Sequence, residues 1–393
     1  MGVSSLRIIV TGLIGQHPRL GGVTWFHIQY MLGLARLGHD VYYLEDSGEW
    51  PYVLDGGPSG DDWVARDPAP NVEYLAAAMS RFGMENKWAY RYPLEPRWFG
   101  LSERKRQALI ESADILINVS GTLEHPEKYR RVPRLVFIDT DPVFTQVKLA
   151  GGDADFCRQV NSHDIHFSFG ECLSPENVPD TGHCWRPTRT PVELSEWHPS
   201  APQRGAFTTI MNWTSYEPES YGGRNYGQKD VEFRKFMDLP RRVAPIVLEV
   251  AMGMGVNEPT PYDLLREKGW RLVDPLRVCP DLESLRTYTE SSRGEWSVAK
   301  NGYVVGRSGW FSERSARYLA AGRPVVLQDT GFSKTLPVGE GILPFTNMEE
   351  SVAAIQAVQS DYVRHSRAAR AIAEEYFDSR KVLSQLIERA QTS

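Results

Sequence analysis

The sequence predicts an α/β protein with two domains of similar size, and three observations support this. The chain has 393 residues, whereas a single hydrophobic core rarely grows beyond about 250–300 residues. In both halves, short β-branched runs alternate with segments whose apolar residues recur at helical spacing, which is typical of parallel sheets covered by helices. A proline-rich connector separates the halves; it contains Pro175, Pro179, Pro187, Pro191, Pro199 and Pro202. Proline blocks helices and central strands, so we place the domain boundary near residue 200.

The first sixty residues predict a strand, a loop with several glycines, a helix and a second strand. The expected ranges are strand 7–11, helix 24–37 and strand 41–44. Because crossover connections are right-handed, these two strands are expected to be parallel. Further along the first half, the pattern predicts a helix at 102–112 and strands at 115–119, 134–138 and 166–169.

The second half of the chain repeats this alternation. Strands are expected at 207–211, 246–250, 303–305 and 324–327, and helices at 229–237 and 312–321. The C-terminal region is strongly helical from residue 348 onward, with a break near Phe377 and Asp378. The two halves therefore have the same kind of architecture without an internal sequence repeat.

Composition limits the classes of protein and partner. Hydrophobic residues make up 41% of the chain and charged residues 24%, which is typical of a globular protein. The formal net charge of −6 does not favour a nucleic-acid-binding surface, so we expect no nucleic-acid partner. The four cysteines form no CxxC pair, so neither a disulfide scaffold nor a structural zinc site is expected.

The N-terminal residues contain one basic residue and a short apolar run, which does not predict a signal peptide. No stretch approaches the roughly 20 apolar residues that cross a bilayer, so we expect no integral membrane segment. These features predict a cytoplasmic protein and leave its oligomeric state open.

A ligand is expected between the two domains, because open parallel sheets bind ligands beyond the carboxyl ends of their strands. In the first loop, Gly21 and Gly22 precede a helix with Thr24 as its expected N-cap. Such glycines let an anionic ligand approach a helix N-terminus, although they also fit a simple tight turn. The loop lacks the GxGxxG fingerprint, which disfavours a NAD-dependent dehydrogenase. Glu45 and Asp46 are then better interpreted as a solvated strand end than as ribose ligands.

Two segments carry a family resemblance. LGGVTWFHIQYMLGLARLGHDVYYLED combines a GG loop, a helix and a GHDV motif that leads into the second strand. YLAAGRPVVLQDTGFSKTLPVGEGILPFTNMEESVAAI combines a helix end, a PVV strand, a D.G loop and a further helix. Together they resemble glycosyltransferases of the GT-B fold, in particular those of the GT4 type, and the chain is also similar to the bacterial CgeB-like group.

This resemblance implies two Rossmann-like domains that face each other across a cleft. An acceptor-binding domain is expected at residues 1–200, a donor-binding domain at 201–377, and a C-terminal helix that packs back on the first domain at 378–393. The implied activity is a hexosyltransferase reaction from a nucleotide-diphosphate sugar, such as a UDP-sugar, to an unidentified acceptor. The resemblance implies neither a metal ion nor a cofactor.

The donor diphosphate needs cationic side chains and preorganised N–H groups. Arg307, Ser308, Gly309 and Ser312 belong to a loop that leads into a helix, where Ser312 is expected as N-cap and the loop amides are expected to hold phosphates. Glu313 has two interpretations of equal weight, as a ligand of the ribose hydroxyls or as a complement to the helix dipole.

Other donor residues follow from the resemblance. Arg224 and Lys229 are similar in position to the Arg/Lys pair that contacts the diphosphate, although their segment also fits a flexible surface loop. Thr330 and Gly331 follow a strand and are expected to seat the sugar or a phosphate. Arg277 lies in the segment whose backbone is expected to contact the base.

The chain departs from the GT4 pattern at one position. That pattern has two glutamates seven residues apart, and the second is replaced here by Arg317, while Glu313 lies one helical turn earlier. The resemblance therefore does not fix which residue contacts the ribose, and donor binding need not copy the GT4 pattern.

Candidates for the catalytic group lie in the first half. Asp139 and Asp141 follow the strand at 134–138 and are expected to act as base or sugar ligand, with an N-cap or turn role as the alternative. His17 lies where inverting GT1-like enzymes often have their base, and His125 is a third candidate. A nucleotide-sugar 2-epimerase of the same fold and a non-catalytic pseudo-transferase that binds a nucleotide sugar are the alternative functions.

Overall fold

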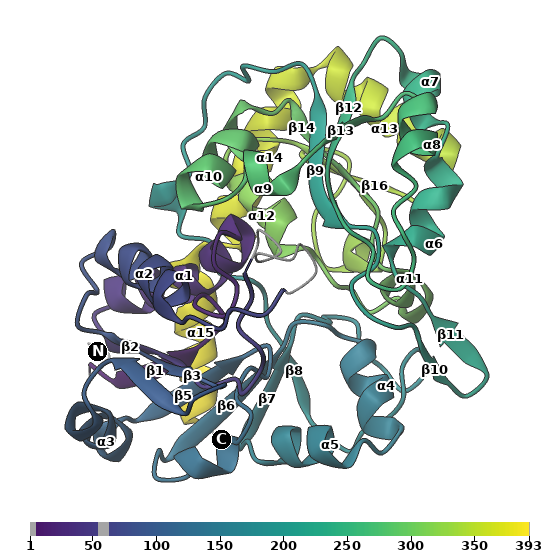
Figure 1. Ribbon diagram of the computed structural model, residues 1–393. Coiled ribbons are helices and arrows are strands. Elements are labelled where there is room, and N and C mark those ends of the chain that lie inside the picture. The colour runs from purple at the N-terminus through teal and green to yellow at the C-terminus, as the bar shows by residue number, and fades with distance from the viewer. Residues whose placement is uncertain (1–4, 54–62, 393) are drawn as a thin grey trace.

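The computed structural model describes residues 5–53 and 63–392, which form two α/β domains joined in one molecule (Figure 1). Each domain is built on its own sheet, and the strands of the two sheets fall on either side of residue 200. Among the described helices, none combines the length and the apolar character that a membrane-spanning segment requires.

The first sheet has eight strands in the order β4-β3-β2-β1-β5-β6-β7-β8, and all neighbours are parallel except β3 and β4. Its strands are β1 (Arg7–Thr11), β2 (Asp40–Glu45), β3 (Trp88–Tyr92), β4 (Arg97–Gly100), β5 (Ile115–Val119), β6 (Arg134–Asp139), β7 (Ile165–Ser168) and β8 (Trp185–Pro187). Its helices are α1 (Gly21–Arg36), α2 (Ala69–Ser80), α3 (Glu103–Ser112), α4 (Phe144–Ala150) and α5 (Ala154–Asn161). The predicted parallel βαβ unit is confirmed, with Arg7 of β1 in register with Asp40 of β2.

The second sheet has six parallel strands in the order β13-β12-β9-β14-β15-β16. They are β9 (Phe207–Asn212), β12 (Leu248–Gly253), β13 (Arg271–Val273), β14 (Gly294–Ser297), β15 (Val325–Gln328) and β16 (Ile342–Phe345). The helices are α6 (Lys229–Phe233), α7 (Leu239–Val243), α8 (Tyr262–Glu267), α9 (Pro275–Val278), α10 (Leu282–Ser291), α11 (Asn301–Gly306), α12 (Glu313–Ala320), α13 (Met348–Ser360), α14 (Tyr362–Tyr376) and α15 (Ser379–Gln391). Strands β10 (Glu219–Tyr221) and β11 (Arg224–Tyr226) form a separate hairpin.

The central strands form because their β-branched side chains are buried on both faces of the sheets. Ile8, Ile9 and Val10 of β1 are fully buried, as are Val325 and Val326 of β15. A continuous apolar run of this kind suits a strand that helices cover on both sides. Burial of these short apolar runs therefore stabilises both sheets through the hydrophobic effect.

The C-terminal helix crosses back to the first domain, as the resemblance implied. In Figure 1, α15 lies beside α1 although it ends the chain. Gly33 of α1 permits this approach, because a Cβ there would lie within 2.8 Å of both Leu383 and Ser379. Ser379 also donates to the Glu193 carboxylate at 2.9 Å, next to the start of α15.

Three local predictions were wrong. Residues 303–305 belong to helix α11 rather than to a strand. Helix α1 begins at Gly21, so Thr24 lies inside it and its hydroxyl donates to the Leu20 carbonyl instead of capping the helix. The proline-rich connector contains an additional strand, β8, which ends at Pro187 on the edge of the first sheet. Proline is tolerated there because an edge strand leaves one row of N–H groups unpaired.

The two domains touch on both sides of the cleft between them. On one side, α1 packs on α10, and the Trp25 indole donates to the Leu282 carbonyl at 2.7 Å. On the other side, the Phe144 ring of α4 packs edge-on against Tyr216 and Tyr303, with ring centroids 5.2 and 5.6 Å apart. Figure 1 shows the β10–β11 hairpin and α11 beside α4.

Candidate active site

A cavity of about 350 Å³ lies between these two contacts, at the carboxyl ends of both sheets. From the first domain it is lined by Leu13, Gly22, Val23, Phe26, His27, Ser120, Thr140, Asp141 and Phe169. From the second domain it is lined by Lys229, Lys300, Tyr303, Trp310, Ser312, Glu313 and Arg314. The fold thus brings five of the predicted site residues together: Gly22, Asp141, Lys229, Ser312 and Glu313.

Lys229 supplies the positive charge of the second domain. It is the first residue of α6, is half-buried and lines the cavity. Its ammonium forms no hydrogen bond or ion pair with any described residue. Burial lowers the pKa of Lys229 to about 7, and the nearby cations Arg314 and Lys300 lower it further. A half-buried amine with neighbouring cations and no described partner is a natural place for an anion.

Arg314, which also lines the cavity, connects two strands of the second sheet. Its Nε donates to Glu295 at 2.5 Å, one terminal nitrogen donates to the Ile210 carbonyl at 2.7 Å and the other to Ser297 at 2.8 Å. These partners belong to β9 and β14. Because every arm of the guanidinium is used, Arg314 is a fixed part of the cavity wall.

Helix α12 presents its N-terminus to the cavity. Ser312 is its N-cap, as predicted, because the Ser312 hydroxyl accepts from the Arg314 N–H at 3.3 Å. Arg317 contacts the Glu313 carboxylate at 3.4 Å and the Gly22 carbonyl at 3.2 Å. Burial alone would raise the pKa of Glu313, but the positive charges of Arg317, Arg314 and Lys229 outweigh burial and lower it. Arg317, which stands where the GT4 pattern has a glutamate, therefore keeps Glu313 ionised and joins it to the first domain.

Asp141 lies in a polar cluster with three residues of the second domain that the sequence did not reveal. Lys300 donates to its two carboxylate oxygens at 3.0 and 3.1 Å. The hydroxyls of Tyr216 and Tyr303 also donate to it, one to each oxygen. Lys300 further donates to the Tyr216 hydroxyl at 2.6 Å. Burial and the Asp141 charge raise the pKa of both tyrosines, so both hydroxyls stay protonated and act as donors.

Asp139 does not reach the cavity. It is buried, and its carboxylate accepts from Thr145 at 2.7 Å, Gln146 at 3.0 Å and Ser168 at 2.7 Å, all in the first domain. Burial raises the pKa of Asp139, and these hydrogen bonds oppose that rise. Asp139 also accepts from the Asp141 N–H at 3.0 Å, which fits its alternative interpretation as a turn residue, whereas the N-cap of α4 is Val143.

The two predicted histidines also lie outside the cavity lining. His17 stacks on Tyr52 with ring centroids 4.8 Å apart, and burial lowers the pKa of His17 to about 4. His27 of α1 lines the cavity instead; it is buried, and its Nδ1 has no hydrogen-bond partner among the described residues. Its position four residues after Val23, on the same helical face, is a signal that sequence reasoning passed over.

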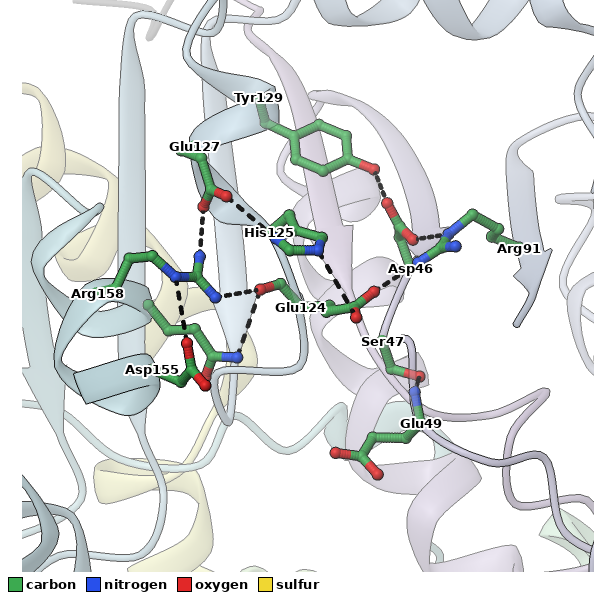
Figure 2. Close-up of polar contacts among 11 residues, drawn as sticks. Asp46, Ser47, Glu49, Arg91, Glu124, His125, Glu127, Tyr129, Asp155 and Arg158 are labelled. Atoms are coloured by element: carbon green, nitrogen blue, oxygen red, sulfur yellow. Dashed lines mark hydrogen bonds and ion pairs between the residues drawn. The ribbon is translucent and has the colours of Figure 1, made fainter. Parts of the chain in front are cut away.

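His125 belongs to a surface network of the first domain, shown in Figure 2. It lies between Glu127, at 3.1 Å, and Glu124, at 3.6 Å. Arg91 joins Glu124 to Asp46, which also accepts from the Tyr129 hydroxyl at 2.6 Å. Asp46 is thus a buried partner in this network rather than a solvated strand end.

Glu45 is likewise buried at the end of β2. Its carboxylate accepts from the N–H groups of Gly15 and Gln16, at 2.8 and 2.5 Å, and from the Tyr43 hydroxyl at 2.7 Å. These bonds fold the loop between β1 and α1 against the sheet. Burial raises the pKa of Glu45 to about 7 even though the three donors oppose it.

Four other residues that were predicted to bind the sugar donor do not line the cavity. The Gly21 N–H donates to the Cys279 carbonyl at 3.2 Å, and a Cβ at Gly21 would collide with the Asp281 carbonyl, so this glycine serves the contact between domains. The last three are arginines outside the cavity: Arg224 is exposed on β11, Arg277 is exposed on α9 and contacts Asp274 at 3.6 Å, and Arg307 pairs with Asp329 at 3.2 Å.

The expected phosphate-binding amides of two loops are occupied within the protein. The Gly309 N–H donates to the Thr330 carbonyl at 2.9 Å, and the Gly331 N–H donates to Asp329 at 2.9 Å. The Ser308 carbonyl accepts from the Cys172 N–H of the first domain at 2.8 Å. Ser308, Gly309, Thr330 and Gly331 therefore build the domain contact beside the cavity and do not line the cavity itself.

No group of three or more His, Cys, Asp or Glu side chains among residues 5–53 and 63–392 is arranged to hold a metal ion. Among these residues, Asp141 pairs with Lys300 across the domains, whereas Arg314 and Glu313 pair within the second domain with Glu295 and Arg317.

Solved structures with the same architecture show which fold this is. The chain is similar to alpha-glucosyltransferase in complex with UDP and a 13-mer DNA (12% identity, 99% of this chain and 100% of that chain, TM-score 0.59). It is also similar to sucrose-phosphate synthase from Thermosynechococcus elongatus (13% identity, 98% of each chain, TM-score 0.54). A third match is Anabaena Alr3699/HepE in complex with UDP and glucose (10% identity, 99% and 100%, TM-score 0.57).

This chain has the GT-B fold. Both Rossmann-like domains and the cleft between them are covered by these matches. Protein-family models and curated protein sequences give no match. At such low identity, the GT-B structures establish the architecture, and the chemistry must be inferred from the cavity itself.

Proposed function

We propose that this protein is a glycosyltransferase that transfers a sugar from a nucleotide-diphosphate sugar to an acceptor bound by the first domain. The observation that carries the proposal is the position of Lys229. It lies in the cavity of a GT-B fold, beside the N-terminus of α12, and has no partner within residues 5–53 and 63–392. A diphosphate there would receive the Lys229 charge and the dipole of α12, and both favour a leaving group that gains negative charge.

The first domain supplies polar groups on the opposite wall. Ser120 and Thr140 line the cavity, and their hydroxyls lie 2.7 Å apart. They suit an acceptor or donor-sugar hydroxyl, because each can both donate and accept a hydrogen bond. Closure of both domain contacts around the cavity excludes water from a reactive sugar.

We propose UDP as the nucleotide because three similar solved structures contain it. They are two complexes of alpha-glucosyltransferase and one complex of HepE. The test is thermal unfolding of the protein with UDP, GDP, ADP or dTDP. Saturation at about 100 times the Kd adds about 2.7 kcal/mol of stability, which raises the Tm by several degrees. Absence of a shift with all four nucleotides contradicts the proposal.

Turnover separates transfer from the two other nucleotide-sugar functions. With UDP-GlcNAc alone, a 2-epimerase forms the epimeric nucleotide sugar, whereas a transferase releases UDP only slowly, by hydrolysis, until an acceptor is added. A pseudo-transferase binds the nucleotide sugar without either product. Mass spectrometry of the nucleotide pool distinguishes the three outcomes.

We also infer that the reaction needs no metal ion, because Lys229 and α12 offer positive charge to the diphosphate. UDP affinity should then be the same with Mg²⁺ and with EDTA, and a loss of more than about tenfold in EDTA contradicts this inference.

A nucleic-acid acceptor needs a separate test, because several of the similar alpha-glucosyltransferase structures contain DNA. The net charge of −6 leads us to expect no binding of a 13-mer duplex in a gel-shift assay at physiological salt. A salt-dependent shifted band would show that this expectation is wrong.

A further inference from the structure

The hydrogen bonds of the Asp141 carboxylate indicate a role other than that of a proton acceptor. A carboxylate offers about four lone-pair positions. At Asp141 these are met by two contacts from Lys300 and one each from Tyr216 and Tyr303. All three donors come from the second domain, whereas Asp141 belongs to the first. No position on this carboxylate is left to take a proton from an acceptor hydroxyl.

The donors of this cluster are rigidly held. Tyr303 is buried and stacks on Trp310 with ring centroids 4.2 Å apart, and the Trp310 indole donates to the Thr140 carbonyl at 3.2 Å. Gly302 lies against Phe144 of the first domain, where a Cβ would come within 2.5 Å of the ring. The cluster therefore exists only while α4 and α11 are in contact.

A short chain of backbone contacts connects the cluster to Lys229. Lys300 immediately precedes α11, and the N–H of the next residue, Asn301, donates to the Gln228 carbonyl at 3.2 Å. The Gly302 N–H donates to the Gly227 carbonyl at 3.0 Å, and the Gly227 N–H donates to the Asn301 side chain at 3.0 Å. Residues 227 and 228 directly precede Lys229 and are thus held at the start of α11 by hydrogen bonds.

We propose that Asp141 is a positioning residue that couples contact between the domains to the placement of Lys229 in the nucleotide site. When the domains meet, Asp141 binds Lys300 and the two tyrosines, which fixes the start of α11. The start of α11 in turn fixes residues 227 and 228, and so aims the Lys229 ammonium. This inference rests on the proposed function for the identity of the ligand, but the coupling is a property of the protein alone.

The first arm of the test measures UDP affinity by calorimetry in Asp141→Asn, Tyr303→Phe and the double variant. Asparagine keeps the shape of Asp141 but removes its charge, so UDP affinity should fall by about tenfold. Tyr303→Phe should lower it by about threefold, and the double variant should be no weaker than Asp141→Asn, because both changes break one unit. Asp155→Asn and Tyr221→Phe, which change exposed residues outside the cavity lining, are the matched controls.

A proton acceptor would give the opposite pattern. Asp141→Asn would then abolish transfer while leaving UDP affinity within about twofold of the wild-type value, and Tyr303→Phe would not reproduce its effect. That result overturns the inference. Circular dichroism and the Tm of each variant establish that it is folded.

The second arm needs no nucleotide. Hydrogen exchange of the unliganded protein should be faster at the amides of Gly227, Asn301 and Gly302 in Asp141→Asn than in wild type, and unchanged in Asp155→Asn. Equal exchange in Asp141→Asn and wild type overturns the coupling. If wild type fails to bind any nucleotide, the proposed function falls, and the exchange experiment still decides whether Asp141 positions this segment.

Discussion

The carboxyl edges of the two sheets meet at one cavity but differ in how their charges are paired. On the first-domain side, Asp139 is satisfied within its own domain and Asp141 is saturated by donors from across the cleft. On the second-domain side, Arg314 is fully bonded, whereas Lys229 has no partner in the part of the chain that the structure describes. The second domain therefore retains binding capacity for an anion, while the first domain contributes neutral hydroxyls and a contact between the domains.

The largest effect is expected from Arg314, which supports the second-domain edge. Arg314→Met leaves the Glu295 carboxylate buried without its cation, because Glu295 is fully buried in β14. We expect the free energy of unfolding to fall by about 3–5 kcal/mol. Chemical denaturation measures this, with Arg131→Met as a control, since its pair with Glu111 is exposed and contributes less than about 1 kcal/mol. Equal effects of the two variants would contradict the role assigned to Arg314.

The next effect concerns Lys229 itself. Lys229→Ala removes the unpartnered charge from the cavity while leaving the fold intact, so UDP affinity should fall by roughly 10- to 100-fold. Lys381→Ala, which removes a half-exposed lysine of α15 that pairs with Glu375, is the matched control. If Lys229→Ala binds UDP as wild type does, the anion site has been assigned to the wrong domain edge.

The pH dependence of binding sharpens the same comparison. Lys229 has a pKa near 7 in the unliganded protein, so above pH 7 the anion must bind together with a proton. UDP affinity should therefore fall as pH rises from 7.5 to 9, by at most about tenfold per pH unit. Lys229→Arg should remove this slope because arginine stays charged. Calorimetry at three pH values in both proteins measures it, and identical slopes would show that another group titrates.

The smallest effect is a loss of stability in acid that arises in the first domain. In the first domain, His163 is buried and its Nε2 lies 3.1 Å from Asn118 Nδ2; the Asn118 oxygen accepts from Thr11, which leaves the amide to face the ring. Burial lowers the pKa of His163 to about 4, below its ordinary value of 6.5. The unfolded chain therefore binds more protons between these values, and stability is lost as pH falls from about 6.5 toward 4.

We expect His163 to account for a loss of about 1–2 kcal/mol in the free energy of unfolding between pH 7 and pH 5, beside losses from His17, His27 and His166, whose pKa values burial also lowers. Denaturation at the two pH values in wild type and His163→Gln measures this change. The variant should lose stability at pH 7 but show a shallower pH slope, and an unchanged slope would assign the acid sensitivity to other groups.

The sequence predicted those elements whose stability is local in origin. Strand β5 was predicted at its observed bounds, because Ile115 to Val119 is an uninterrupted run of residues that suit a buried strand. Strand β14 was missed, since Gly294, Glu295 and Ser297 are poor strand formers whose burial depends on a distant partner, Arg314. Tertiary contact overrides local propensity in such a segment.

The same missed strand explains most of the missed site. Lys300 and Tyr303 follow β14, and without that strand the loop after it was not recognised as part of the cleft. Tyr216 lies in a long loop, and only the contact with α4 shows that it reaches Asp141. Lys229 was found through the resemblance to GT-B glycosyltransferases, and Asp141 was found because it follows the predicted strand at 134–138.

Helix α15 makes the order of the chain differ from the order of its structural units. A polypeptide ending near residue 200 would leave the α1 surface around Gly33 uncovered, because Leu383 and Ser379 come from the opposite end of the sequence. Separate expression of the two lobes therefore calls for a permuted design in which residues 379–391 are joined ahead of, or behind, the first lobe. The polypeptide also passes between the lobes twice, so any rocking of one lobe on the other must bend two linkers at once.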